Sequence, residues 1–176
     1  LKNGLRPLQL YSTEEGQLLK DKLDSFCASK TPDETELKQV LCLLLHGQCH
    51  GIDFSLTLLK IIQMQLSTDL MIFSLSASIK WVVEFNQKNG HPITLDFMNI
   101  INALLINNSE PEIREWVIRL VDSTGNQSLK FKKTLLILKP LLKPKLLRKK
   151  NLHNKISYEI IIALEEKWEK ILGSLR

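Results

Sequence analysis

The sequence predicts an all-α protein, and three observations support this prediction. Apolar residues recur with the 3.6-residue period of helices along most of the chain. No segment between turn signals alternates apolar and polar residues with the period of two that a half-buried strand requires. Helix-capping sequences precede several of the apolar segments. We therefore expect seven or eight helices and no β-sheet in this chain of 176 residues.

Three segments have the spacing of a capping box, in which a hydroxyl and a glutamate three residues later each bind the other's backbone amide. The boxes begin at Ser12, Thr31 and Ser109. Prolines follow the second and third hydroxyls, at Pro32 and Pro111, and proline has no amide to leave unpaired in a first helical turn. The sequence therefore predicts a helix start at each of these hydroxyls.

The apolar rows after these caps indicate where the helices lie. The first helix carries Leu19, Leu23 and Phe26, and the second carries an apolar row over 37–45. Short segments rich in glycine, asparagine and proline separate the helices that follow. Further helices are expected at 54–66, 69–86, 95–107, 113–121 and 129–139, and an amphipathic C-terminal helix at 156–172.

The chain also contains a weak internal similarity. A shift of 43 residues places 52–62 on 95–105, with several apolar positions in common. A period of about 40 to 47 residues with two helices per period is typical of helical solenoids. Over roughly 31–139 the chain thus resembles the HEAT/armadillo superfamily in its period and apolar pattern. The resemblance implies a single domain, 1–176, of stacked antiparallel helices forming an α-solenoid; a compact helical bundle is the alternative.

One short cluster has the residue types of a metal site. It consists of Cys42, His46, Cys49 and His50. In an unbroken helix Cys42 and His50 would lie about 12 Å apart, whereas zinc binds its ligands at about 2.3 Å. No second Cys/His pair exists to complete the site. We therefore predict a helix junction, with Gly47 ending one helix, Gly51 in the turn and Asp53 capping the next helix, and no metal or other cofactor. A metal site and a reactive cysteine are the alternatives.

The composition is that of an ordinary globular protein, with 44% hydrophobic and 24% charged residues. No apolar run approaches the roughly 18 residues that a membrane span needs. The first residues lack the apolar region of a secretory signal, and the chain opens at Leu1 rather than at methionine, as a fragment of a longer protein would. Three cysteines are too few for a disulfide framework. We expect a cytoplasmic protein, or a nuclear one if the source is eukaryotic.

Catalytic motifs are missing from the sequence. It has no glycine-rich phosphate loop and no serine in a strand–turn–helix elbow. The resemblance implies one enzymatic alternative, because a DNA glycosylase family uses HEAT-like repeats with aromatic and acidic groups on a concave face. Trp116 and Asp122 would take those places, but Trp116 falls within an apolar helical row, and we expect it in the core. Burial of Trp116 together with Trp81 and Trp168 would argue against this alternative.

Charge is distributed unevenly along the chain. Residues 123–158 contain ten Lys and Arg residues and no Asp or Glu. The whole chain carries +5, so the other residues together carry −5. Because like charges repel one another, this basic segment favours an anionic partner that shares its surface. The cations that we expect to contact the partner are Lys130, Lys132, Lys133, Lys139, Lys143, Lys145, Arg148, Lys149 and Lys150.

Three classes of partner fit the basic segment, and we favour a protein. Lysines attract nucleic-acid phosphates, but a single arginine and two nearby aromatics, Phe131 and Tyr158, do not favour base readout. Anionic lipid would suit the leucine pairs and lysines of 140–150, although two prolines shorten this segment. A solvated face that binds nothing specific is an alternative, and exposed leucines near 141–147 would indicate a subunit of a larger assembly. We therefore predict a non-enzymatic binding or scaffold module.

Overall fold

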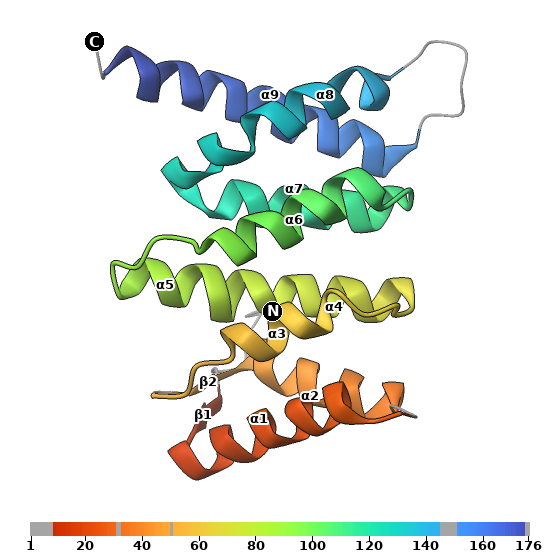
Figure 1. Ribbon diagram of the computed structural model, residues 1–176, viewed down its shortest axis with the longest axis vertical. Coiled ribbons are helices and arrows are strands. Elements are labelled where there is room, and N and C mark those ends of the chain that lie inside the picture. The colour runs from red at the N-terminus through yellow and green to blue at the C-terminus, as the bar shows by residue number, and fades with distance from the viewer. Residues whose placement is uncertain (1–8, 31–32, 50, 145–150, 175–176) are drawn as a thin grey trace, which may run out of the picture. The chain divides into compact units, whose positions relative to one another are not determined.

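The structure is a computed structural model that describes residues 9–30, 33–49, 51–144 and 151–174 (Figure 1). The protein is all-α, as the sequence predicts. The described residues contain one small β-structure, a pair of three-residue strands. The chain forms two compact units, Leu1–Trp81 and Val82–Arg176, and each is described by itself below.

The first unit consists of four helices in two layers. Helix α2 packs against α1 and α4, and α3 also packs against α1 and α4, so α1 and α3 form one layer and α2 and α4 the other. The core between them includes Leu23, Leu41, Phe54 and Ile61. The elements are β1 (Gln9–Tyr11), α1 (Thr13–Ala28), α2 (Glu34–His46), β2 (Gly47–Cys49), α3 (Ser55–Ile61) and α4 (Thr68–Ser78), which continues into the π-helix η1 (Ile79–Glu84).

The expectation that no sheet is present was wrong. Strand β1 pairs in parallel with β2, with Tyr11 opposite Cys49. Strands of three residues are too short to show an alternating pattern, so this pair leaves no signal in the sequence. Its formation depends on Gly47, since a Cβ atom there would lie 1.9 Å from a carbon of the Tyr11 ring. The Tyr11 hydroxyl donates to the carbonyl oxygen of Leu43 at 3.1 Å and fastens β1 to α2.

The half-exposed carboxylate of Asp24 joins α1 to α3. Asp24 accepts hydrogen bonds from the Thr57 hydroxyl at 2.5 Å and the Lys20 amine at 2.8 Å. Burial acts to raise the pKa of Asp24, but the hydrogen bonds from Lys20 and Thr57, with the charges of Lys20 and Lys60, hold it below its ordinary value. Asp24 is therefore stabilised in its charged form in the folded protein.

The second unit also has two layers, one of α6 and α8 and one of α7 and α9. Helix α6 packs against α7 and α8, and α9 packs against α7 and α8 (Figure 1). Its core includes Phe97, Ile118, Phe131 and Trp168, whose indole nitrogen donates to the Ser128 hydroxyl at 3.0 Å. After the end of η1 come α5 (Phe85–Lys88), α6 (Leu95–Asn107), α7 (Pro111–Ser123), the 3-10 helix η2 (Gly125–Phe131), α8 (Lys132–Leu142) and α9 (Leu152–Gly173).

The predicted helix boundaries agree with the structure to different degrees. Helix α6 has the predicted bounds, and α9 contains the amphipathic segment predicted at 156–172. The helix predicted at 54–66 already ends at Ile61, and the Gln63 side chain donates to the carbonyl oxygen of Leu59 after it. The helix predicted at 69–86 continues to Lys88 through η1 and α5. Helix α8 starts later than predicted because η2 precedes it, and it passes through Pro140 in its last turn.

The three predicted capping boxes have different outcomes. The box at Ser12 is confirmed, since its hydroxyl accepts from the Glu15 amide at 3.1 Å and its own amide donates to the Glu15 carboxylate at 2.7 Å. The caps of α2 and α7 were placed too early. Asp33, an equally good capping residue, caps α2, and Thr31 lies outside the described residues. Helix α7 begins at a proline, and its N-cap Glu110 makes no side-chain capping bond.

The internal similarity connects corresponding elements of the two units. The 43-residue shift places the first residue of α4, Thr68, on the first residue of α7, Pro111. It places α3 within α6. Each match therefore joins helices that take the same position within a pair of successive helices. Membership of the HEAT/armadillo superfamily stays a prediction.

Candidate partner-binding surface

Helix α8 has one buried side and one exposed side. Leu135, Leu138 and Leu142 point into the second unit and are buried. On the opposite side, Ile137 is 64% exposed and Leu141 is 73% exposed. The spacing of these rows follows the helical period, so the two sides are separate faces of one helix. We define the α8 outer face as the exposed residues Lys133, Leu136, Ile137, Pro140 and Leu141, with Lys130 before them and Lys143 after them.

Three of the predicted contact residues are free to meet a partner. Lys130, Lys133 and Lys143 are exposed, and none of them forms an ion pair with any residue that the structure describes. Lys130 and Lys133 lie at the N-terminal end of the α8 outer face, and Lys143 follows its C-terminal end. The sequence interpretation named exposed leucines near 141–147 as the sign of a subunit of a larger assembly. Leu141 is exposed, Leu142 is buried, and 145–147 lie outside the described residues. Ile137 was not recognised as a contact residue, although Lys133, Ile137 and Leu141 follow one another at intervals of four residues.

Two other predicted contact residues are engaged within the second unit. The Lys132 amine lies 5.9 Å from the centroid of the Trp168 ring. Lys139 forms an ion pair with Glu165 of α9, and its amine lies 5.9 Å from the centroid of the Tyr158 ring. The hydrogen bond to Glu165 raises the pKa of Lys139 against the opposing effect of burial. Both lysines therefore serve to hold α8 on α9, and we no longer count Lys139 as a free contact residue.

The remaining predicted contacts, Lys145, Arg148, Lys149 and Lys150, lie outside the described residues. The expectation that the basic segment lacks counter-ions needs correction, because α9 supplies acidic partners. Glu165 neutralises Lys139, and Glu159 lies 3.7 Å from the Lys155 amine. Both glutamates follow the basic segment in the sequence, so a count over 123–158 alone misses them.

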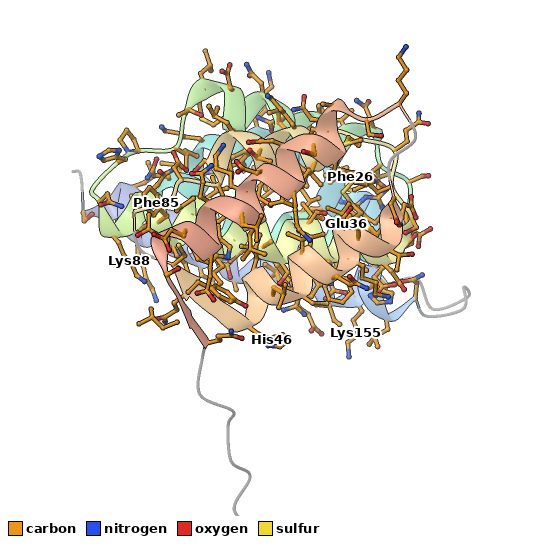
Figure 2. All side chains as sticks on the ribbon, turned by 90° about the horizontal axis from the view of Figure 1, so that it is seen from below. Phe26, Glu36, His46, Phe85, Lys88 and Lys155 are labelled. Carbon is orange, nitrogen blue, oxygen red and sulfur yellow. The ribbon has the colours of Figure 1, made fainter. Side chains whose placement is uncertain are left out.

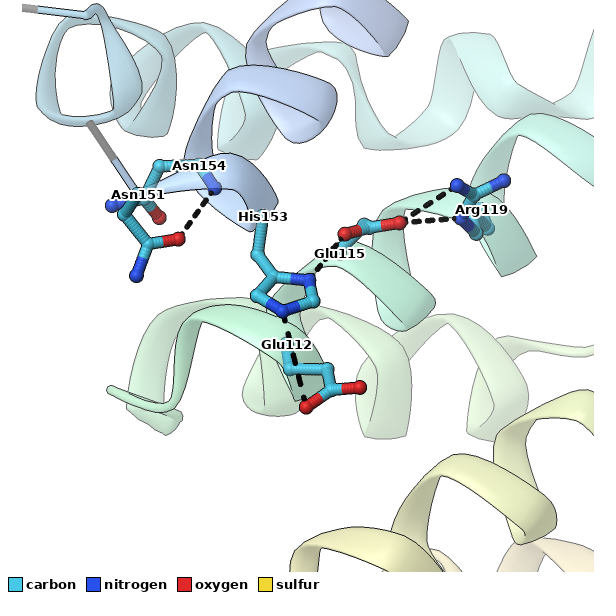
Figure 3. A network of polar contacts seen from close by, with 6 residues as sticks. All are labelled: Glu112, Glu115, Arg119, Asn151, His153 and Asn154. Atoms are coloured by element: carbon cyan, nitrogen blue, oxygen red, sulfur yellow. Dashed lines mark hydrogen bonds and ion pairs between the residues drawn. The ribbon is translucent and has the colours of Figure 1, made fainter.

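A buried carboxylate fastens the start of α9 to α7 (Figure 3). Glu115 is only 4% exposed, and each of its two carboxylate oxygens contacts a different side chain. One lies 2.7 Å from His153 Nδ1, and the other accepts from Arg119 Nε at 2.8 Å. The Asn151 side chain caps α9 beside this cluster by accepting from the Asn154 amide at 3.1 Å. Because a buried carboxylate is costly without such partners, the contact between Glu115 and His153 joins the first turn of α9 to α7.

The Cys/His cluster of the sequence is divided between two places. Cys42 and His46 line an open groove of about 540 Å³ along α2, together with Tyr11 and Leu43. Figure 2 shows His46 at the end of α2 nearest the strands, whereas Glu36 lies near the opposite end of α2 and Phe26 near the end of α1. The thiol of Cys49 instead faces α1, with Sγ 3.7 Å from the carbonyl oxygen of Ser12.

The junction between α2 and α3 bears on both alternatives for the Cys/His cluster, a reactive cysteine and a metal site. Burial raises the pKa of the Cys49 thiol, assisted by the charge of Glu15, and burial likewise raises the pKa of Cys27. His50 lies outside the described residues, and among the described ones no group of three His, Cys, Asp or Glu side chains is arranged to hold a metal ion. Gly47 follows α2 as its C-cap. The N-cap of α3 is Phe54 and not the predicted Asp53, whose side chain accepts from the Ser55 amide at 2.8 Å from one position earlier. The predicted junction is therefore present, with a strand inserted in it.

The tryptophans do not all lie in the core. Trp81 and Trp168 are buried, but Trp116 is only half-buried, and the expectation that it is a core residue was wrong. Its helix buries the neighbouring Glu115 instead, because the ion pairs of Glu115 satisfy that charge. The Arg119 guanidinium lies 5.6 Å from the centroid of the Trp116 ring. Asp122, the acidic residue of the glycosylase alternative, is exposed and lies 3.9 Å from the Lys167 amine.

Comparison with known proteins does not identify a relative. No family model, no curated protein and no solved structure matches this chain. Among the helices that the structure describes, none combines the length and the apolar character required to cross a membrane.

Proposed function

We propose that the protein is a non-enzymatic binding or scaffold module whose α8 outer face engages an anionic partner. The observation that carries this proposal is the set of three exposed lysines, Lys130, Lys133 and Lys143, none of which has a carboxylate partner among the described residues. Exposed Ile137 and Leu141 lie between them. Cations and apolar side chains on one helical face supply both attraction and contact area to a partner.

The packing behind this face supports a binding role. Helix α8 is held by α6, α9 and η2, and its buried leucines lie in the core of the second unit. A partner would therefore meet a preorganised helix and would lose little free energy in ordering it. A frame of helix pairs like that of HEAT/armadillo proteins is consistent with this role, since such proteins present extended binding surfaces.

Charge reversal at the three exposed lysines tests the proposal. The variant K130E/K133E/K143E is compared with K30E/K88E/K170E, which makes the same change in net charge at three exposed lysines elsewhere. Four labelled anionic probes are titrated at about 50 and 200 mM salt: an acidic peptide, duplex DNA, single-stranded RNA and phosphatidylserine vesicles.

We expect the parent to bind at least one probe in a salt-dependent way. The α8 variant should bind it at least about tenfold more weakly, while the control variant stays within about threefold. Circular dichroism confirms that both variants remain helical. Equal losses in the two variants would show that only net charge matters and would contradict the proposed surface.

The half-exposed position of Trp116 favours a second candidate, a glycosylase-like enzyme that acts on nucleic acid. The proposed acidic group, Asp122, lies six residues further along α7, which places the two side chains about 120° apart around the helix. An assay for base release from damaged duplex DNA tests this candidate. Release by the parent, and its loss in Asp122→Asn, would favour the enzyme over the binding module.

A further inference from the structure

The α8 outer face has the dimensions and pattern of a helix-binding surface. Helix α8 contains 11 residues, which span about 16 Å or three turns. Ile137 and Leu141 form a row along it, and Leu136, which is 37% exposed, widens this row. Rows of this spacing are what an amphipathic helix presents to another helix. Lys130 and Lys133 precede this row along the chain and Lys143 follows it, so none of these three lysines lies between Ile137 and Leu141.

The opposite side of α8 shows how this helix already accommodates a helical neighbour. Helix α9 packs against α8, and both helices contribute buried apolar residues, Leu138 and Leu164 among them. At the edge of this contact the Lys139 amine meets the Glu165 carboxylate. The contact therefore combines an apolar row with a lysine–glutamate pair beside it. The α8 outer face offers an apolar row with lysines near it as well, but none of the described helices covers it.

We propose that the α8 outer face binds an amphipathic helix of a protein partner, with an apolar stripe that is flanked by Asp or Glu side chains. This inference rests on the proposed function and names the partner's chemistry. Charge complementarity places the acidic flanks of that helix opposite Lys130, Lys133 and Lys143. The apolar stripe covers Ile137 and Leu141, which a purely charged ligand would leave in water.

The other anionic partners fit this face less well. A nucleic-acid backbone would use the lysines but would leave the apolar row uncovered. The α8 outer face contains no aromatic side chain on which a base could stack and no arginine for base readout. A lipid surface would accept the row, but membrane-binding helices usually carry more cations and bulky aromatic anchors than these three lysines and three aliphatic residues.

Two variants separate the apolar from the electrostatic part of the contact. I137S/L141S removes the apolar row, and its control L56S/L95S makes the same change at two leucines that are 75% and 66% exposed elsewhere. K130E/K133E/K143E removes the cations. The probes are a synthetic helix of about five turns with leucines at intervals of three and four residues and glutamates beside them, and a scrambled peptide of identical composition.

We expect the parent to bind the amphipathic peptide at least about tenfold more tightly than the scrambled peptide. I137S/L141S and the lysine variant should each weaken binding at least about tenfold, while L56S/L95S stays within about twofold. Circular dichroism and thermal melting show that each variant is folded.

The possible failures are distinguishable. Equal binding of the two peptides, or binding that survives I137S/L141S, would overturn the amphipathic-helix inference while the proposed anionic partner stands. Lysine-dependent binding of DNA or phosphatidylserine vesicles without binding of the amphipathic peptide would do the same. If none of the anionic probes binds the parent, both the inference and the proposed function fail.

Discussion

A lysine, Lys80, binds several carbonyl oxygens at the C-terminal end of α2. The Lys80 amine donates to the carbonyl oxygens of Leu44 and Leu45, each at 3.0 Å, and also to that of Gly47. The indole nitrogen of Trp81 donates to the Leu44 carbonyl as well, at 3.0 Å. The last carbonyls of a helix have no partner inside the helix, and a cation there also interacts favourably with the helix dipole. The variant Lys80→Met removes the amine and keeps most of the apolar stem.

The expected cost follows from these contacts. A hydrogen bond to a charged group contributes about 1.5–3 kcal/mol, and a cation at a helix C-terminus contributes about 0.3–1 kcal/mol. Lys80 is only half-buried, so water replaces part of what is lost. We therefore expect the free energy of unfolding to fall by about 2–4 kcal/mol, which is less than the sum over three bonds. For a chain of this length the melting temperature should fall by about 4–16 °C.

Urea unfolding followed by circular dichroism measures this loss. Lys88→Met is the matched control, because Lys88 is exposed and forms no ion pair with the described residues. Its free energy of unfolding should stay within about 0.5 kcal/mol of the parent. If Lys80→Met also stays within that range, water satisfies the end of α2 and the capping role of Lys80 is refuted.

Three further changes test other contacts by urea unfolding. Gly47→Ala places a methyl group on the Tyr11 ring and should lower the free energy of unfolding by about 1–3 kcal/mol. Gly173→Ala, where the added methyl group has open space, should change the free energy of unfolding little. Equal effects of the two substitutions would contradict the close packing of Gly47 against Tyr11. Glu115→Gln leaves the partners of a buried carboxylate without its charge and should cost about 1–3 kcal/mol; an unchanged stability would show that the cluster does not fasten α9. Because the pKa of Asp24 is lowered in the folded state, its charge stabilises the fold above its unfolded pKa and loses this effect as pH falls through the folded pKa. The stability advantage of the parent over Asp24→Asn should therefore shrink below about pH 4, and an advantage independent of pH would be inconsistent with the lowered pKa.

The sequence was sufficient to predict those helix bounds that depend on residues close in the chain. The bounds of α6 were predicted because loop-type segments precede and follow its apolar row. The structure adds that Thr94 caps its start, with its hydroxyl accepting from the Phe97 amide. The strands were missed because their pairing joins Tyr11 to Cys49 across a whole helix pair. The late start of α8 was missed because a 3-10 helix has nearly the same apolar pattern over seven residues.

The candidate surface was predicted only in part, because charge composition can be read from the sequence but contacts between distant helices cannot. The excess of lysine is visible in the sequence, and Lys130, Lys133 and Lys143 are exposed as a partner contact requires. The engagement of Lys139 was not predictable from its neighbours, since its partner Glu165 follows 26 residues later on another helix. The burial of Glu115 beside a half-exposed Trp116 reverses what their polarity suggests. Glu115 pairs with Arg119 of the same helix and with His153 of α9, and the second partner lies 38 residues later in the sequence.

The most direct test of the α8 outer face as a binding surface is the dissociation constant of the amphipathic acidic peptide for three proteins. These are the parent, I137S/L141S and the exposure-matched L56S/L95S. We expect at least about tenfold weaker binding for I137S/L141S and nearly unchanged binding for L56S/L95S. Equal dissociation constants for all three proteins would contradict a role for this face in binding a helix.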